Sequence, residues 1–92
     1  MDHKNSHANV RLLFSNVPVD CHDDYLRQWV EARGYSVLRL RLVRDYVSGT
    51  SPSFAYVQLM NPEKIEEAAR ALNGQTIGEC KIQVARTFAR AT

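Results

Sequence analysis

The sequence lacks the features that mark secreted, membrane and zinc-binding proteins. Among its 92 residues are two cysteines, Cys21 and Cys80, too few for a disulfide framework and in no metal-ligand spacing with the three histidines. No run approaches the roughly 18 consecutive apolar residues of a membrane span. The polar start of the chain is unlike a secretory signal. We therefore expect an intracellular protein with reduced thiols, no membrane association, no metal and no other cofactor.

Motifs of catalysis are also missing. The sequence contains no GxxxxGK[ST] phosphate loop and no GxGxxG fingerprint. It shows no Ser-His-Asp or Cys-His arrangement. Nor do paired carboxylates occur on the exposed face of the β-sheet that is predicted below. The neighbours Cys21 and His22 are no nucleophile and base, because adjacent residues point apart. These absences predict a binding protein rather than an enzyme.

What the sequence does contain is an alternation of strand and helix signals over one domain-sized chain. The predicted strands are Val10–Val17, Val37–Arg44, Phe54–Met60 and Lys81–Ala85, and the predicted helices run from His22 to Gly34 and from Asn61 to Gly74. The order β-α-β-β-α-β predicts an α+β, ferredoxin-like sandwich, in which a four-stranded antiparallel sheet is backed by two helices on one face. We expect this domain at residues 10–86, with a flexible tail at 1–9 and a C-terminal tail at 87–92.

A sheet with one covered face should alternate between buried apolar and exposed polar positions. The positions predicted to point inward are Leu12, Phe14, Leu38, Leu40, Leu42, Ala55, Val57, Leu59, Ile82 and Val84. The helices should meet them with apolar stripes, namely Tyr25, Leu26, Trp29 and Val30 on the first helix and Ile65, Ala68, Ala69 and Leu72 on the second. Within this set, Trp29 is interpreted as a core residue rather than a partner-binding one.

The same alternation places two aromatic rings, Phe54 and Tyr56, on the open face of the sheet. Exposed neighbouring rings need an explanation: flat rings stack on nucleobases, and cations attract the phosphate backbone. The distribution of charge agrees with this placement, because basic residues are concentrated outside the predicted helices. The two predicted helices hold six acidic and four basic residues, which leaves eight of the 12 basic and four of the 10 acidic residues elsewhere. The open face is therefore a candidate surface for nucleic acid.

Two strands carry a family resemblance. The segment Ser53–Leu59 (SFAYVQL) resembles the longer signature of the RNA-recognition-motif family, and Leu12–Val17 (LLFSNV) resembles its shorter signature. The resemblance covers Val10 to Arg86 and implies binding of single-stranded RNA by base stacking and phosphate contacts. The predicted RNA-binding residues are Arg11, Leu13, Ser15, Arg39, Arg41, Phe54, Tyr56, Gln58, Lys81, Gln83 and Arg86.

The match also has departures, and these leave alternatives open. Pro52 and Ser53 stand at the basic and glycine positions of the longer signature, and Leu13 stands at a stacking aromatic. A protein-interaction module of the same fold is therefore the alternative function, with a protein partner or a second copy of the chain. Single-stranded DNA is the alternative nucleic acid, because stacking tolerates either. Tyr46 and Phe88 are each interpreted as either packing residues or extra stacking groups.

Overall fold

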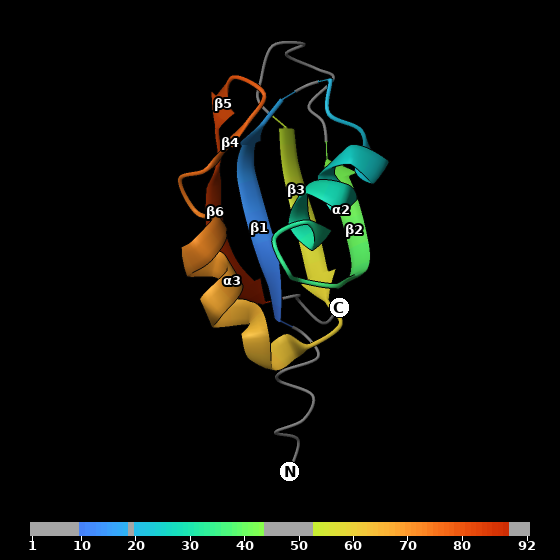
Figure 1. The fold of residues 1–92 in the computed structure, drawn as a ribbon, viewed down its shortest axis with the longest axis vertical. Helices are drawn as coiled ribbons and strands as arrows, with labels where there is room; N and C mark the ends of the chain where they lie inside the picture. Colours follow the sequence, from blue (N-terminus) through green and yellow to red (C-terminus); the bar gives the residue numbers. More distant parts are fainter. Residues whose placement is uncertain (1–9, 19, 44–52, 89–92) are drawn as a thin grey trace.

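The computed structural model describes residues 10–18, 20–43 and 53–88. Within these ranges, four antiparallel strands form a sheet in the order β2-β3-β1-β6. The strands are β1 (Val10–Val17), β2 (Val37–Val43), β3 (Ser53–Leu59) and β6 (Gln83–Phe88), and the helices are α2 (Asp23–Glu31) and α3 (Ile65–Leu72). Both helices cover the same face of the sheet (Figure 1). The predicted α+β, ferredoxin-like architecture is confirmed.

The helix ends follow from local chemistry. Helix α2 begins with Asp23 and Asp24, whose charges suit the positive N-terminal end of a helix. After α2, Gly34 adopts a φ of +98°, a left-handed conformation that favours glycine. Helix α3 is preceded by a short 3₁₀ turn, Pro62–Lys64, and the Asn61 side chain makes no capping hydrogen bond there. No helix in the described ranges is long and apolar enough to cross a membrane.

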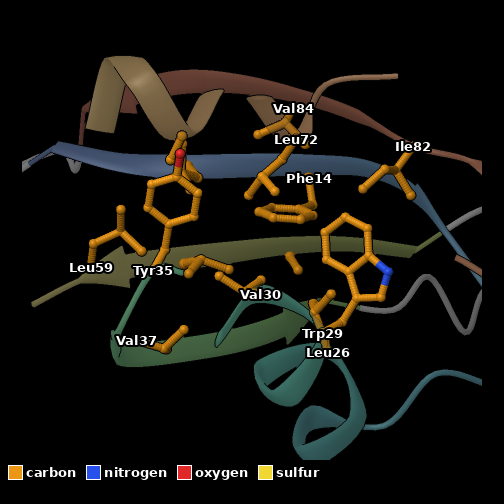
Figure 2. Close-up of a cluster of buried hydrophobic side chains, with 14 of the residues drawn as sticks. Phe14, Leu26, Trp29, Val30, Tyr35, Val37, Leu59, Leu72, Ile82 and Val84 are labelled. Atoms are coloured by element: carbon orange, nitrogen blue, oxygen red, sulfur yellow. The ribbon is translucent and has the colours of Figure 1, made fainter. Parts of the chain in front are cut away.

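The hydrophobic core lies between the helices and the sheet. Its centre is Phe14 of β1, which is fully buried and meets the Trp29 ring edge-on at 6.3 Å between ring centroids (Figure 2). Trp29 is only 7% exposed, so its interpretation as a core residue is confirmed. Burial of each large apolar side chain stabilises the fold by about 1.5–3 kcal/mol.

Two of the residues predicted to point inward are exposed instead. The pairing of β2 with β3 shifts register between Val37 and Arg39, which makes Leu38 the extra residue of a bulge and leaves it 49% exposed. Val37 occupies the core position in its place. Tyr25 is 52% exposed, because the buried stripe of α2 consists of Leu26, Trp29 and Val30 and Tyr25 lies outside it. The predictions for Leu38 and Tyr25 were wrong.

The last predicted strand is divided in two. A small hairpin of β4 (Thr76–Ile77) and β5 (Cys80–Lys81) precedes β6, and its turn includes Gly78 at a φ of +63°. Ile82, between β5 and β6, is fully buried, and its amide N–H donates to the Gln75 carbonyl at 2.8 Å. Strand β6 ends at Phe88, three residues beyond the predicted end at Ala85.

Candidate nucleic-acid interface

The open face of the sheet is organised as rows of side chains that run across the strands. The register of β2, β3, β1 and β6 places four residues in one row, which we call the middle row: Arg41, Tyr56, Leu13 and Ala85. Antiparallel pairing holds these side chains on one face at neighbouring positions. The middle row therefore sets a tyrosine ring between a guanidinium group and an aliphatic side chain.

A second row lies beside the first and carries two more cations. Arg39 pairs with Gln58, and Arg11 pairs with Thr87. Continuing the β1–β3 register by one residue beyond Leu12 and Val57 sets Arg11 opposite Gln58. We call Arg39, Gln58, Arg11 and Thr87 the basic row. Thr87 was predicted to lie in a C-terminal tail; the run of β formers Thr87-Phe88 was the signal for a longer strand.

The third row lies on the other side of the middle row. Val43 pairs with Phe54, and Ser15 pairs with Gln83. A register shift between Phe14 and Val17, where Asn16 has a φ of +65°, interrupts the row between β3 and β1. Phe54 is 44% exposed, whereas Tyr56 is half-buried. Both rings lie on the open face, as the alternation predicted.

A hollow surrounds the tyrosine of the middle row. It has a volume of about 370 Å³ and is lined by Arg11, Arg39, Leu40, Arg41, Tyr56 and Gln58. The lining contains three guanidinium groups and, among the described residues, no carboxylate. Such a site attracts anions and offers one ring face for stacking.

The sequence that forms this face matches a known family. The sequence profile of the RNA recognition motif family matches residues 12–83. This chain belongs to the RNA recognition motif family. The resemblance inferred from Leu12–Val17 and Ser53–Leu59 is thereby confirmed. Membership of this family also bears out the prediction of a binding domain rather than an enzyme.

Individual relatives agree with this assignment. The chain is 34% identical over 73 residues to the serine/arginine-rich SC35-like splicing factor SCL30 of Arabidopsis thaliana, an alignment that covers 79% of the chain and 28% of that protein. The chain thus spans less than a third of that relative.

Solved structures show the same fold. RNA recognition domains 1 and 2 of Sex-lethal from Drosophila melanogaster match with a TM-score of 0.67 at 29% identity, over 90% of this chain and 51% of that one. The RNA recognition motif of Rna15 with bound RNA (GU) matches with a TM-score of 0.65 at 22% identity, over 83% of this chain and 79% of that one.

A second hollow of this RNA recognition motif extends from the middle row past β6. Its volume is about 620 Å³, and its lining includes Leu13, Ser15, Lys81, Gln83 and Ala85. Lys81 belongs to the hairpin strand β5 rather than to the sheet. Its carbonyl accepts a hydrogen bond from Asn16 Nδ2 at 3.0 Å, which ties the hairpin to β1. The structure therefore brings Lys81 to the edge of the predicted surface.

Arg86 lies on the other side of the sheet, apart from the remaining predicted residues. It pairs with the buried Leu12, so its side chain points toward the helices, where Nη1 donates to Glu66 Oε2 of α3. Its guanidinium carbon lies 5.8 Å from the centroid of the Phe88 ring. The strict period of two along β6 explains both placements: Arg86 and Phe88 follow Val84 at two and four residues. Neither belongs to the open face.

The remaining predicted positions fall elsewhere. Tyr46 and Pro52 lie outside the described residues, and Ser53 is the first residue of β3. Nine predicted residues remain on the open face itself: Arg11, Leu13, Ser15, Arg39, Arg41, Phe54, Tyr56, Gln58 and Gln83.

Proposed function

We propose that this domain binds single-stranded RNA on the open face of its sheet, by stacking bases on Phe54 and Tyr56 and by contacts of arginines with phosphates. One observation carries the proposal: the Tyr56 ring lies on the sheet face that neither helix covers, in a hollow lined by three arginines. Membership of the RNA recognition motif family and the likeness to the RNA-bound Rna15 domain support it.

Stacking supplies the sequence-tolerant part of the binding energy. Each base on a ring contributes about 1–3 kcal/mol, so the two rings contribute about 2–6 kcal/mol. Leu13 offers an aliphatic contact where a third ring would add to this sum. We therefore expect modest affinity for a short RNA, raised by any second binding site on the same polypeptide.

The arginines supply the part that depends on salt. Each phosphate neutralised on a single strand contributes a slope of about −0.7 to the dependence of log affinity on log salt concentration. With Arg11, Arg39 and Arg41 all engaged, affinity should fall by about 20-fold between 50 and 200 mM salt. A smaller loss would mean that fewer of the three contact phosphates.

Stacking and charge would serve RNA and single-stranded DNA equally. The preference for RNA therefore rests on the family assignment. The likeness to a splicing factor also favours an intracellular role in RNA processing. That likeness extends over 28% of the splicing factor.

A protein partner is the second candidate. A hollow lined by Pro18, Cys21, Tyr25 and Ile77, among others, lies between the start of α2 and the β4–β5 turn. Tyr25 is exposed there on the face away from the proposed RNA surface. A partner at this site would leave the open face available for RNA.

A fluorescence anisotropy titration with mixed-sequence single-stranded RNA tests the proposal. The double substitution Phe54→Ala with Tyr56→Ala should weaken binding at least about 30-fold, which corresponds to 2 kcal/mol. The matched control Tyr25→Ala removes an exposed ring on α2 and should leave affinity unchanged. Unchanged affinity in a double variant with a native circular dichroism spectrum would rule out the stacking surface.

A further inference from the structure

The hollow between the start of α2 and the β4–β5 turn, which we call the α2 hollow, has an apolar wall. The buried residues Val17, Cys21 and Ile77 belong to its lining, at the point where β1 ends. Its volume is about 830 Å³, more than twice the 370 Å³ of the hollow around Tyr56. Ligand-binding hollows commonly measure about 300–1,000 Å³. The α2 hollow is therefore large enough to receive a side chain from another molecule.

Tyr25 adds an aromatic ring to this lining that the core does not use. It is 52% exposed and lies outside the buried stripe of α2. Pro18 lines the same hollow, so the ring is part of an apolar surface rather than an isolated side chain. Tyrosine is enriched at protein interfaces because its ring is apolar and its hydroxyl can stay in water. The ring is thus placed to pack against an apolar side chain that enters the hollow.

Acidic residues surround the apolar part of the α2 hollow. Asp20 and Glu79 belong to the lining and are exposed. Asp23 and Asp24, also exposed, follow in the first turn of α2. These four negative charges attract lysine and arginine and repel the phosphates of RNA. The α2 hollow should therefore select a ligand opposite in charge to the one attracted by the arginines around Tyr56.

We propose that the α2 hollow docks a protein segment in which an aromatic or large aliphatic anchor lies between lysine or arginine residues. The anchor packs against Tyr25 and the apolar wall, and the flanking cations face Asp20 and Glu79. This inference names the chemistry of the protein partner considered above and does not depend on RNA binding. A desolvated anchor supplies most of the affinity at such a surface, whereas charges at its edge set orientation and association rate.

The charges also argue against a second copy of this chain as the occupant. A two-fold dimer through the α2 hollow would set the same patch of both copies face to face. The four carboxylates of one copy would then approach the four of the other, and like charges at an interface are costly. A basic segment of another protein avoids this repulsion.

Fluorescence anisotropy with labelled synthetic peptides tests the proposal on the 92-residue chain. The probe carries one tryptophan between two pairs of arginines. One control peptide has alanine in place of the tryptophan and should bind at least about tenfold more weakly. A second control has glutamates in place of the arginines and should not bind. Absence of binding by the tryptophan peptide, or equal binding of the tryptophan and alanine peptides, would overturn the proposal.

Two matched pairs of variants locate the contact. Tyr25→Ala should weaken binding of the tryptophan peptide at least about tenfold. Phe88→Ala removes another exposed ring and should have no effect. Glu79→Gln should weaken binding by about two- to fivefold, whereas Glu63→Gln removes an exposed carboxylate before α3 and should not. Full affinity in Tyr25→Ala contradicts the proposal.

NMR amide shifts of the labelled protein identify the occupant. Peptide-induced shifts at Cys21, Tyr25, Ile77 and Glu79 would support the α2 hollow, and shifts around Tyr56 instead would overturn it. The same shifts on concentrating the protein alone would assign the hollow to a second copy, and on adding RNA they would assign it to RNA; either result contradicts the proposal. Failure of the peptide experiments leaves the proposed RNA binding standing, because the RNA titration uses no peptide.

Discussion

Tyr56 of β3 and Leu13 of β1 are register partners at the centre of the open face. In the family signature a stacking ring stands at the position of Leu13, so Tyr56 has an aliphatic neighbour in this chain. This relation suggests a gain-of-function substitution, because a ring can be added at the half-buried Leu13 on the open face without replacing a core residue.

The substitution Leu13→Tyr should therefore strengthen RNA binding. A second ring in the middle row adds one base stack, worth about 1–3 kcal/mol. Anisotropy titrations at one fixed salt concentration measure the change. Ala71→Tyr serves as the control, because it adds the same ring on the exposed surface of α3. If both variants bind RNA like the wild type, the middle row does not stack bases.

Phe14 and Phe54 should differ in their contribution to stability, because one is a core residue and the other lies on the open face. Phe14 is fully buried against Trp29, so Phe14→Ala should lower the free energy of unfolding by about 3–5 kcal/mol. Phe54 is 44% exposed, and Phe54→Ala should cost about 1 kcal/mol or less. Urea unfolding followed by the fluorescence of Trp29, the single tryptophan, measures both. A large loss of stability for Phe54→Ala would mean that its ring belongs to the core.

Tyr35 should make stability fall at alkaline pH. Burial raises the pKa of its phenol above the ordinary value of 10.0, and the hydrogen bond to Glu67 Oε2 at 2.9 Å and the charge of that carboxylate raise the pKa further. The unfolded chain therefore releases this proton first. The contribution is complete below pH 10 and is lost as pH rises from 10 toward the higher folded pKa, by up to about 1.4 kcal/mol per pH unit.

The variant Tyr35→Phe isolates this effect, because it keeps the ring and removes the ionisable hydroxyl. Urea midpoints measured from pH 8 to 11 should decline more steeply above pH 10 for the wild type than for the variant. Parallel curves would mean that the Tyr35 phenol ionises equally well in the folded and unfolded chains.

The fold and most of the open face follow from sequence because β3 and residues 10–15 of β1 alternate strictly. Strands covered by helices on one face show this pattern: Leu12 and Phe14 point inward, and Phe54 and Tyr56 point outward. The alternation fails at Leu38 because of a β-bulge. The sequence of β2 alternates between apolar and basic residues, but the extra residue in the bulge leaves Leu38 exposed. Periodicity cannot locate such a residue, since the shift depends on pairing with β3.

One further feature was beyond the reach of sequence patterns, and another could have been predicted from them. The strands of the β4–β5 hairpin are two residues each, too short to show any period. Arg86 was predicted to bind RNA, although two residues after Val84 the alternation points inward.

Arg41 and Arg86 provide the sharpest test of which face binds RNA. Each substitution, Arg41→Gln or Arg86→Gln, removes one positive charge, so the change in net charge is the same. Arg41 is the register partner of Tyr56 on the open face, whereas Arg86 donates to Glu66 on the helix side. Arg41→Gln should weaken RNA binding and reduce the steepness of its salt dependence by about 0.7, the value of one phosphate contact. Arg86→Gln should leave that slope unchanged and cost at most about 1 kcal/mol of stability, as expected for an exposed ion pair. Titrations at four salt concentrations separate the two. Equal losses would show that RNA responds to net charge alone rather than to the arrangement of arginines around Tyr56.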